Sequence, residues 1–115
     1  RVGLDTEFHA ENRYEPEFML LQLALEDGRA WIVDPKALSL FDLGNALKGV
    51  EIVTHGGQED IRLLRRHLGF VPERIFDTQI AAALLGEHYP IRLDSLLQNR
   101  LSISISKQFQ TQKWE

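Results

Sequence analysis

The sequence predicts an α/β protein built on one mixed β-sheet, in which an antiparallel meander is followed by βα units and helices pack on the sheet. Strand-like apolar segments fill the first third of the chain, and helical spacing of leucines follows them. Glycine and proline separate these segments. At 115 residues, the chain is long enough for one domain with a buried core.

The first three elements are expected to be strands. Residues 2–8 alternate between apolar and polar positions, and residues 18–25 form a nearly continuous apolar run of strand length. A turn at Glu26-Asp27-Gly28 leads into a third strand over 30–33. We expect Trp31 in this third strand to belong to the core.

The second half of the chain alternates between helical and extended patterns. The expected elements are, in order, a helix over 40–47, a strand over 50–54, a helix between Gly57 and Gly69, an Ala-rich helix over 78–85 with Asp77 as its N-cap, and a short helix over 93–97. The order β-β-β-α-β-α-α-α predicts a mixed sheet with helices packed on it.

Two carboxylates share one face of the first strand. Asp5 and Glu7 are one residue apart, which places them roughly 7 Å from each other at the backbone. Carboxylates this close repel each other unless a cation or a proton lies between them. Because they close an apolar strand, we interpret them as part of a functional site, whereas Glu15 and Glu17, with the same spacing, fit a solvated loop.

Asp60 is a third candidate. Counted helically, it lies over Leu63 and Leu64 on the buried side of its helix. By itself it fits either a metal ligand shared with the first strand or a first-turn acid favoured by the helix dipole. Together with Asp5 and Glu7 it provides oxygen ligands of the kind that Mg²⁺ or Mn²⁺ prefers. Two such ions can activate a water and steady the leaving oxygen of a phosphodiester.

Four segments, taken in order, resemble ribonuclease D-type exonucleases. Their first motif and its trailing strand are similar to Asp5-Thr6-Glu7-Phe8, Tyr14 and Met19-Leu20-Leu21-Gln22. Their second motif is similar to Thr54-His55-Gly56-Gly57-Gln58-Glu59-Asp60. The segment that follows in the family is similar to Phe76-Asp77-Thr78-Gln79-Ile80-Ala81-Ala82, and a later Lys…Trp element to Lys107 and Trp114.

This resemblance implies a ribonuclease H-like fold and a metal-dependent 3′–5′ exonuclease. The implied substrate is the single-stranded 3′ end of RNA or DNA, with RNA favoured, hydrolysed by a two-metal mechanism. The resemblance makes Asp5, Glu7 and Asp60 the catalytic residues and the ligands of Mg²⁺ or Mn²⁺, with two ions in the complete enzyme.

Three residues beside the acids are expected to contact nucleic acid. These are Thr6, Phe8 and His55. Phe8 fits equally well as a core residue, and His55 as a structural residue at a strand end. We interpret the arginines at 62, 65 and 66 as a solvated helix face and not as phosphate ligands.

The chain departs from the family pattern near its end. The third motif of the family, a Tyr followed four residues later by an Asp, should come shortly after Trp114, but the sequence ends at Glu115. Lys113 also stands where an acidic residue usually precedes the Trp. We therefore expect residues 1–115 to be a single domain of a longer chain, incomplete at both ends and inactive or nearly so by itself. We interpret Asp77 as a helix N-cap and not as the missing acid.

Composition sets further limits. A net charge of −4 argues against binding through a broad basic face, although divalent cations can reverse the sign of a cleft locally. The absence of Cys excludes thiolate metal sites and fits a reducing cytoplasm, and no apolar run approaches membrane-spanning length. We therefore expect a cytoplasmic protein that has no membrane partner.

Two other functions stay open. A domain of the same fold could bind nucleic acid or a protein without catalysis, but a site kept only for binding has no need of three repelling carboxylates. A metal-dependent phosphatase can also carry an acidic pair at the end of its first strand. That chemistry uses a second Asp two residues after the first, where this chain has Glu7.

Overall fold

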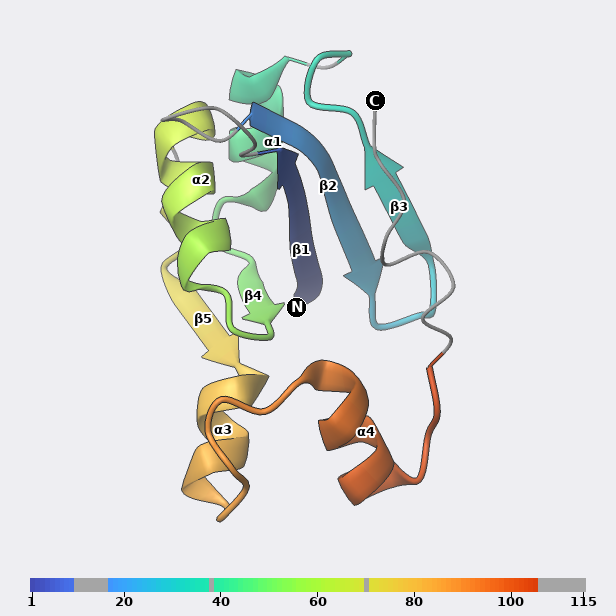
Figure 1. The fold of residues 1–115 in the computed structure, drawn as a ribbon. Helices are drawn as coiled ribbons and strands as arrows, with labels where there is room; N and C mark the ends of the chain where they lie inside the picture. Colours follow the sequence, from blue (N-terminus) through green and yellow to red (C-terminus); the bar gives the residue numbers. More distant parts are fainter. Residues whose placement is uncertain (10–16, 38, 70, 106–115) are drawn as a thin grey trace.

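The computed structural model describes residues 1–9, 17–37, 39–69 and 71–105. The elements in chain order are β1 (Val2–His9), β2 (Glu17–Leu25), β3 (Ala30–Val33), α1 (Leu40–Leu47), β4 (Glu51–Thr54), α2 (Gln58–Leu68), β5 (Arg74–Asp77), α3 (Thr78–Leu84) and α4 (Leu93–Leu101) (Figure 1). No helix in these ranges is long and apolar enough to cross a membrane.

The five strands form one mixed sheet with β1 at its centre. The strand order is β3-β2-β1-β4-β5. The pairs β1–β2 and β2–β3 are antiparallel, while β1–β4 and β4–β5 are parallel. The predicted α/β class, with a meander followed by βα units, is therefore confirmed.

The core lies on one face of the sheet. Val2 and Leu4 of β1 pack with buried residues of β2, β4, α1 and α2, namely Leu21, Leu23, Leu47, Ile52 and Leu64. Figure 1 shows α1 and α2 along one side of the sheet, and α3 and α4 grouped together beyond it. The opposite face carries a hollow of about 640 Å³, lined by Gly3, Asp5, Val53 and His55 among others. The two faces of β1 therefore separate the core from Asp5 and Glu7.

Two expectations about the sheet were wrong. The sequence did not predict β5, whose four residues show no apolar alternation and become a strand by pairing with β4. Trp31, expected in the core, is 48% exposed, since it lies in the edge strand β3 and beside the open face. Its ring contacts the guanidinium of Arg29 at 5.4 Å.

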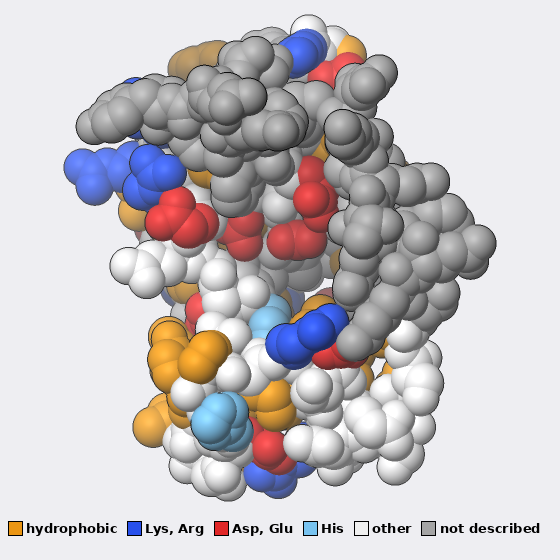
Figure 2. All heavy atoms as spheres, in the orientation of Figure 1, with side chains coloured by type: hydrophobic (Ala, Val, Ile, Leu, Met, Phe, Trp, Pro, Cys, Tyr) orange, Lys and Arg blue, Asp and Glu red, His pale blue; other side chains and the backbone are white. Residues whose placement is uncertain are grey.

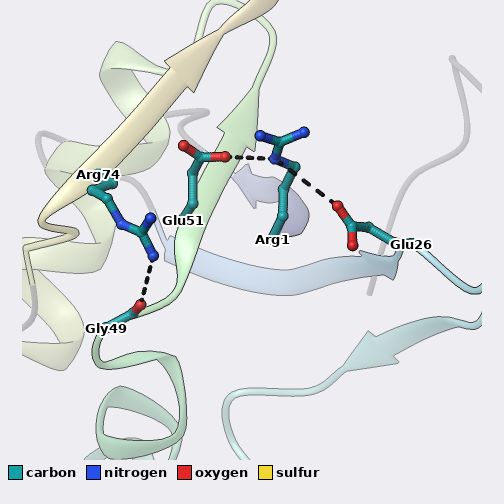
Figure 3. Close-up of polar contacts among 5 residues, drawn as sticks. All are labelled: Arg1, Glu26, Gly49, Glu51 and Arg74. Atoms are coloured by element: carbon teal, nitrogen blue, oxygen red, sulfur yellow. Dashed lines mark hydrogen bonds and ion pairs between the residues drawn. The ribbon is translucent and has the colours of Figure 1, made fainter.

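Polar contacts join the beginnings of three strands (Figure 3). Arg1 Nε lies 2.5 Å from Glu51 Oε1 and 4.0 Å from Glu26 Oε1. Arg74 donates to the carbonyl of Gly49 at 3.1 Å. Arg1 and Glu26 are largely exposed and Glu51 is partly exposed, so the contribution of these pairs to stability is small. They bring together the segments that begin β1, β4 and β5.

Candidate active site

Asp5 and Glu7 lie in the central strand, on the face opposite the core. Their neighbour Leu4 is buried, as the alternation predicted. Thr6, which was expected to contact nucleic acid, is also buried, at 6% exposed, and its hydroxyl is bonded to Asp60. The pairing of β1 with β2 shifts register between Glu7 and Phe8, immediately after the acidic pair. Figure 2 shows Asp and Glu side chains gathered near the middle of the visible face.

Asp60 occupies the first turn of α2 and is only 8% exposed. It lies on the same side as Leu63 and Leu64, which are fully buried, so its predicted position on the buried side of the helix is confirmed. The hydroxyl of Thr6 donates a hydrogen bond to Asp60 Oδ1. Thr6 therefore joins the middle of the acidic pair to the third acid, across 54 residues of sequence.

All three carboxyl groups resist ionisation. Desolvation and then repulsion from Glu7 raise the pKa of Asp5, although this residue is exposed at the open face. Partial burial and then repulsion from Asp60 raise the pKa of Glu7. Burial also raises the pKa of Asp60, with repulsion from Asp5 adding to it against the bond from Thr6. Repulsion from another member of the trio thus raises the pKa of each carboxyl group, as expected for like charges near one another.

The donor set is suitable for a hard divalent cation. Asp5, Glu7 and Asp60 offer only oxygen ligands, and a cation among them would remove their mutual repulsion. Within the described ranges, however, no three Asp, Glu or His side chains lie close enough to hold one ion. The assignment of the trio as metal ligands stays a prediction.

The Thr6 hydroxyl gives a direct test of this arrangement. Thr6→Val keeps the shape of the side chain and removes the donor to Asp60, which leaves a buried carboxylate oxygen without that bond. We expect the affinity of the full-length protein for Mn²⁺ to fall roughly tenfold, the scale of losing a group that orients a metal ligand. Titration of free Mn²⁺ measures the change.

Thr6→Ser is the matched variant, because it keeps the hydroxyl and removes only a methyl group. It should bind Mn²⁺ nearly as wild type does. Equal Mn²⁺ affinities in the Val variant and the wild type would show that the Thr6–Asp60 bond does not orient a metal ligand.

His55 lies directly after β4, half-buried at the hollow. Its Nε2 is 2.7 Å from the carbonyl of Ile91, so this nitrogen carries the proton. Its Nδ1 is 2.8 Å from Thr78 Oγ1, which also lies 3.0 Å from the carbonyl of Thr54. Both ring nitrogens are therefore engaged within the protein. A nucleic-acid contact through either nitrogen would have to replace one of these bonds.

Asp77 caps α3, and its predicted role as an N-cap is confirmed. Its Oδ1 accepts from the backbone N–H of Gln79 at 2.9 Å. The same carboxylate also accepts from Gly56 and Gly57, in the turn that precedes α2. The sequence indicated the cap but not these two longer-range bonds.

The remaining predicted residues are placed only in part. Phe8 pairs with Phe18 in the β1–β2 ladder, but its side chain is outside the described part of the structure. Tyr14, Lys107 and Trp114 also lie outside the described residues. The arginines at 62, 65 and 66 are exposed, as expected, and that at 62 pairs with Glu59 at 2.9 Å.

The strand order and the acids on the central strand define an α/β domain of the ribonuclease H-like class. The family model described as 3′-5′ exonuclease matches residues 1–115. The chain belongs to this 3′–5′ exonuclease family.

Its relatives include proteins named Ribonuclease D. The chain is 36% identical over 118 residues to Ribonuclease D of Zymomonas mobilis, covering 98% of this chain and 30% of that protein. The crystal structure of Escherichia coli RNase D, an exoribonuclease involved in structured RNA processing, matches with a TM-score of 0.87 and 26% identity, covering 98% of this chain and 31% of that one. The structure of Brucella melitensis NrnC bound to pGG matches with a TM-score of 0.82 and 27% identity. The match covers 98% of this chain and 57% of NrnC. The resemblance to ribonuclease D-type enzymes is confirmed, and the chain spans about 30% of the length of the curated relatives.

Proposed function

We propose that the protein containing this chain is a metal-dependent 3′–5′ exonuclease that hydrolyses RNA from its 3′ end. The observation that carries the proposal is the acidic trio, of which Asp5 and Glu7 lie in the central strand and Asp60 lies in the first turn of α2. Each of its carboxyl groups has a raised pKa, caused first by desolvation and then by the repulsion of a neighbouring acid. A trio of this kind is costly to hold in a folded protein unless cations use it.

Asp5, Glu7 and Asp60 would hold the cations. Bound Mg²⁺ or Mn²⁺ would supply an activated water and charge stabilisation for the leaving oxygen. The chain's own contribution is position: β1 presents Asp5 and Glu7 on its open face, and α2 presents Asp60 from its first turn. The Thr6 hydroxyl keeps one oxygen of Asp60 oriented and leaves the other for a cation.

RNA is the favoured substrate. Relatives that are 36% and 33% identical to this chain are named Ribonuclease D, and the matched Escherichia coli enzyme is described as an exoribonuclease. NrnC was solved bound to pGG, which supports a short single-stranded ligand for this fold.

The proposal also concerns the family's third motif. Residues 1–115 contain no Tyr followed four residues later by Asp. We expect that pair to complete the site in the full-length protein, and residues 1–115 alone to show little turnover.

Chelation tests the proposed function directly. We expect the full-length protein to release nucleotides stepwise from a 3′-terminal single strand, to stop in excess EDTA, and to recover with added Mg²⁺ or Mn²⁺. The measurement follows 5′-labelled RNA on a gel, with a 3′-phosphate-blocked strand and a DNA strand of the same sequence as controls. Undiminished activity in EDTA, or purely internal cuts, would contradict the proposal. Binding of the strand with no cleavage under any metal would favour a non-catalytic module.

A further inference from the structure

We propose that Asp77 is a positioning residue for Asp60: its carboxylate fixes the turn that begins α2, and so sets where Asp60 meets the acids of β1. This inference rests on the proposed function, because it assigns Asp77 a role at the same site. Asp77 itself touches none of the reacting groups.

The Asp77 carboxylate uses both of its oxygens. Oδ1 accepts from the backbone N–H of Gly56 at 2.9 Å and of Gln79 at 2.9 Å. Oδ2 accepts from the N–H of Gly57 at 3.0 Å. Only the Gln79 bond belongs to the helix that Asp77 caps. The other two reach the β4–α2 turn, 21 and 20 residues earlier in the chain.

This turn determines the first turn of α2. Gly57 is the N-cap of the helix and has no side chain to cap it, and its carbonyl accepts from the N–H of Ile61 at 2.9 Å. Asp60 lies three residues after Gly57, inside the turn that this bond closes. A displacement of Gly57 would therefore move Asp60 relative to β1.

The turn is also closely packed, so moving its backbone would cost free energy. A Cβ on Gly57 would lie 2.2 Å from Thr54 Oγ1, and one on Gly56 would lie 2.9 Å from Gln79 Oε1. Gly56 has a φ of +63°, which L side chains rarely adopt. Thr54 and Gln79 thus hold the turn on two sides, and Asp77 holds it by hydrogen bonds.

A simple cap would not require a negative charge here. Ser, Thr or Asn caps a helix about as well as Asp does. The charge of Asp77 also works against the site, because repulsion from Asp77 contributes to the raised pKa of Asp60. Only a carboxylate can accept hydrogen bonds on both of its oxygens. The N–H of Gly56 donates to one oxygen of Asp77 and the N–H of Gly57 to the other.

The ionisation of Asp77 agrees with this role. Burial opposes the charged form, but hydrogen bonds from the backbone N–H groups of Gly56, Gly57, Gln79 and Ile80 outweigh it. They hold the pKa of Asp77 below its ordinary value. The pKa of Asp77 is therefore lowered, whereas those of the three acids of the site are raised.

Asp77→Asn in the full-length protein is the test. An Asn oxygen at the Oδ1 position keeps the bonds to Gly56 and Gln79, while its NH₂ group faces the N–H of Gly57. We expect Mn²⁺ affinity to fall roughly ten- to hundredfold, the range for residues that orient metal ligands. We also expect kcat to fall while KM changes little, because the strand still binds.

Three further variants make the result decisive. Ser39→Ala removes the N-cap of α1, where Ser39 accepts from Asp42, and should leave Mn²⁺ affinity unchanged. Asp60→Asn provides the reference for a lost ligand. Asp77→Ser keeps a cap on α3 without the reach to both glycines, and it should lose Mn²⁺ affinity as Asp77→Asn does, even if the Asn variant folds poorly.

The outcomes separate two failures. If Asp60→Asn weakens Mn²⁺ binding while both Asp77 variants bind as wild type does, Asp77 is only a cap and this inference is overturned alone. If Asp60→Asn binds Mn²⁺ as wild type does, Asp60 is no metal ligand, and the proposed function and this inference are overturned together. A loss in the Asp77 variants that Ser39→Ala reproduces would assign the effect to general stability and overturn the inference as well.

Discussion

Replacing Asp60 with Asn is expected to abolish nuclease activity in the full-length protein while leaving the metal-free protein as stable as before, or more so. Asp60 is buried beside two other acids, and the charges of the trio repel one another. A nearly isosteric amide removes one charge without opening a cavity. We expect a gain of roughly 0 to 2 kcal/mol in chelator, the usual scale for a single substitution.

This gain should depend on pH with a definite sign. The folded state raises the pKa values of Asp5, Glu7 and Asp60 above their ordinary values of 3.8, 4.5 and 3.8. Between the ordinary and the raised values the folded state binds more protons, so metal-free wild type loses stability as pH rises through that window. The Asp60→Asn variant should lose less stability over the same window, so its stability relative to wild type should increase from acid towards neutral pH.

Thermal melts of both proteins measure this, in chelator and in millimolar Mn²⁺ at several pH values. Metal should stabilise the wild type by mass action and the variant much less. If Asp60 serves only the helix dipole, the variant should lose a few tenths of a kcal/mol and respond to metal as wild type does. An Asn variant that is destabilised in chelator yet fully rescued by metal would contradict a shared acidic site.

Gly57→Ala is expected to lower the free energy of unfolding by about 1–3 kcal/mol, the typical cost of inserting a group into a packed region. The new Cβ would lie 2.2 Å from Thr54 Oγ1, 2.5 Å from Thr54 Cβ and 2.8 Å from Thr54 Cγ2. The backbone does not cause this cost, because Gly57 has a φ of −83°, which Ala adopts readily. Since Gly57 is the N-cap of α2, which carries Asp60 in its first turn, the variant should also bind Mn²⁺ more weakly.

Urea denaturation measures the loss, with Gly3→Ala as the matched control. A Cβ on Gly3 meets only ordinary contacts, the closest 3.6 Å from Ala24 Cβ, so that variant should change stability by less than about 0.5 kcal/mol. Adding Thr54→Ala to Gly57→Ala should recover part of the loss, because two of the three clashing atoms disappear. If Gly57→Ala is as stable as Gly3→Ala, the turn is looser than the structure shows.

The sequence by itself determined the local features of this protein. The alternation of residues 2–8 placed Asp5 and Glu7 on the face of β1 away from the core, and helical counting placed Asp60 with Leu63 and Leu64. The N-cap at Asp77 could also be predicted from the sequence, because an N-cap residue bonds a backbone N–H only two or three positions later. The four motifs in order indicated the family that the comparisons confirmed.

Only the tertiary structure decided how these parts meet. β5 has two residues common in strands, Ile75 and Phe76, but its four residues show no alternation, and they form a strand by pairing with β4. Trp31, which follows a turn, was expected in the core, but the strand order places β3 at the sheet edge. The bonds from Thr6 to Asp60 and from the Gly56-Gly57 turn to Asp77 join residues 20 to 54 positions apart. Such bonds leave no periodic signal in a sequence, because partners brought together by folding need no fixed spacing along the chain.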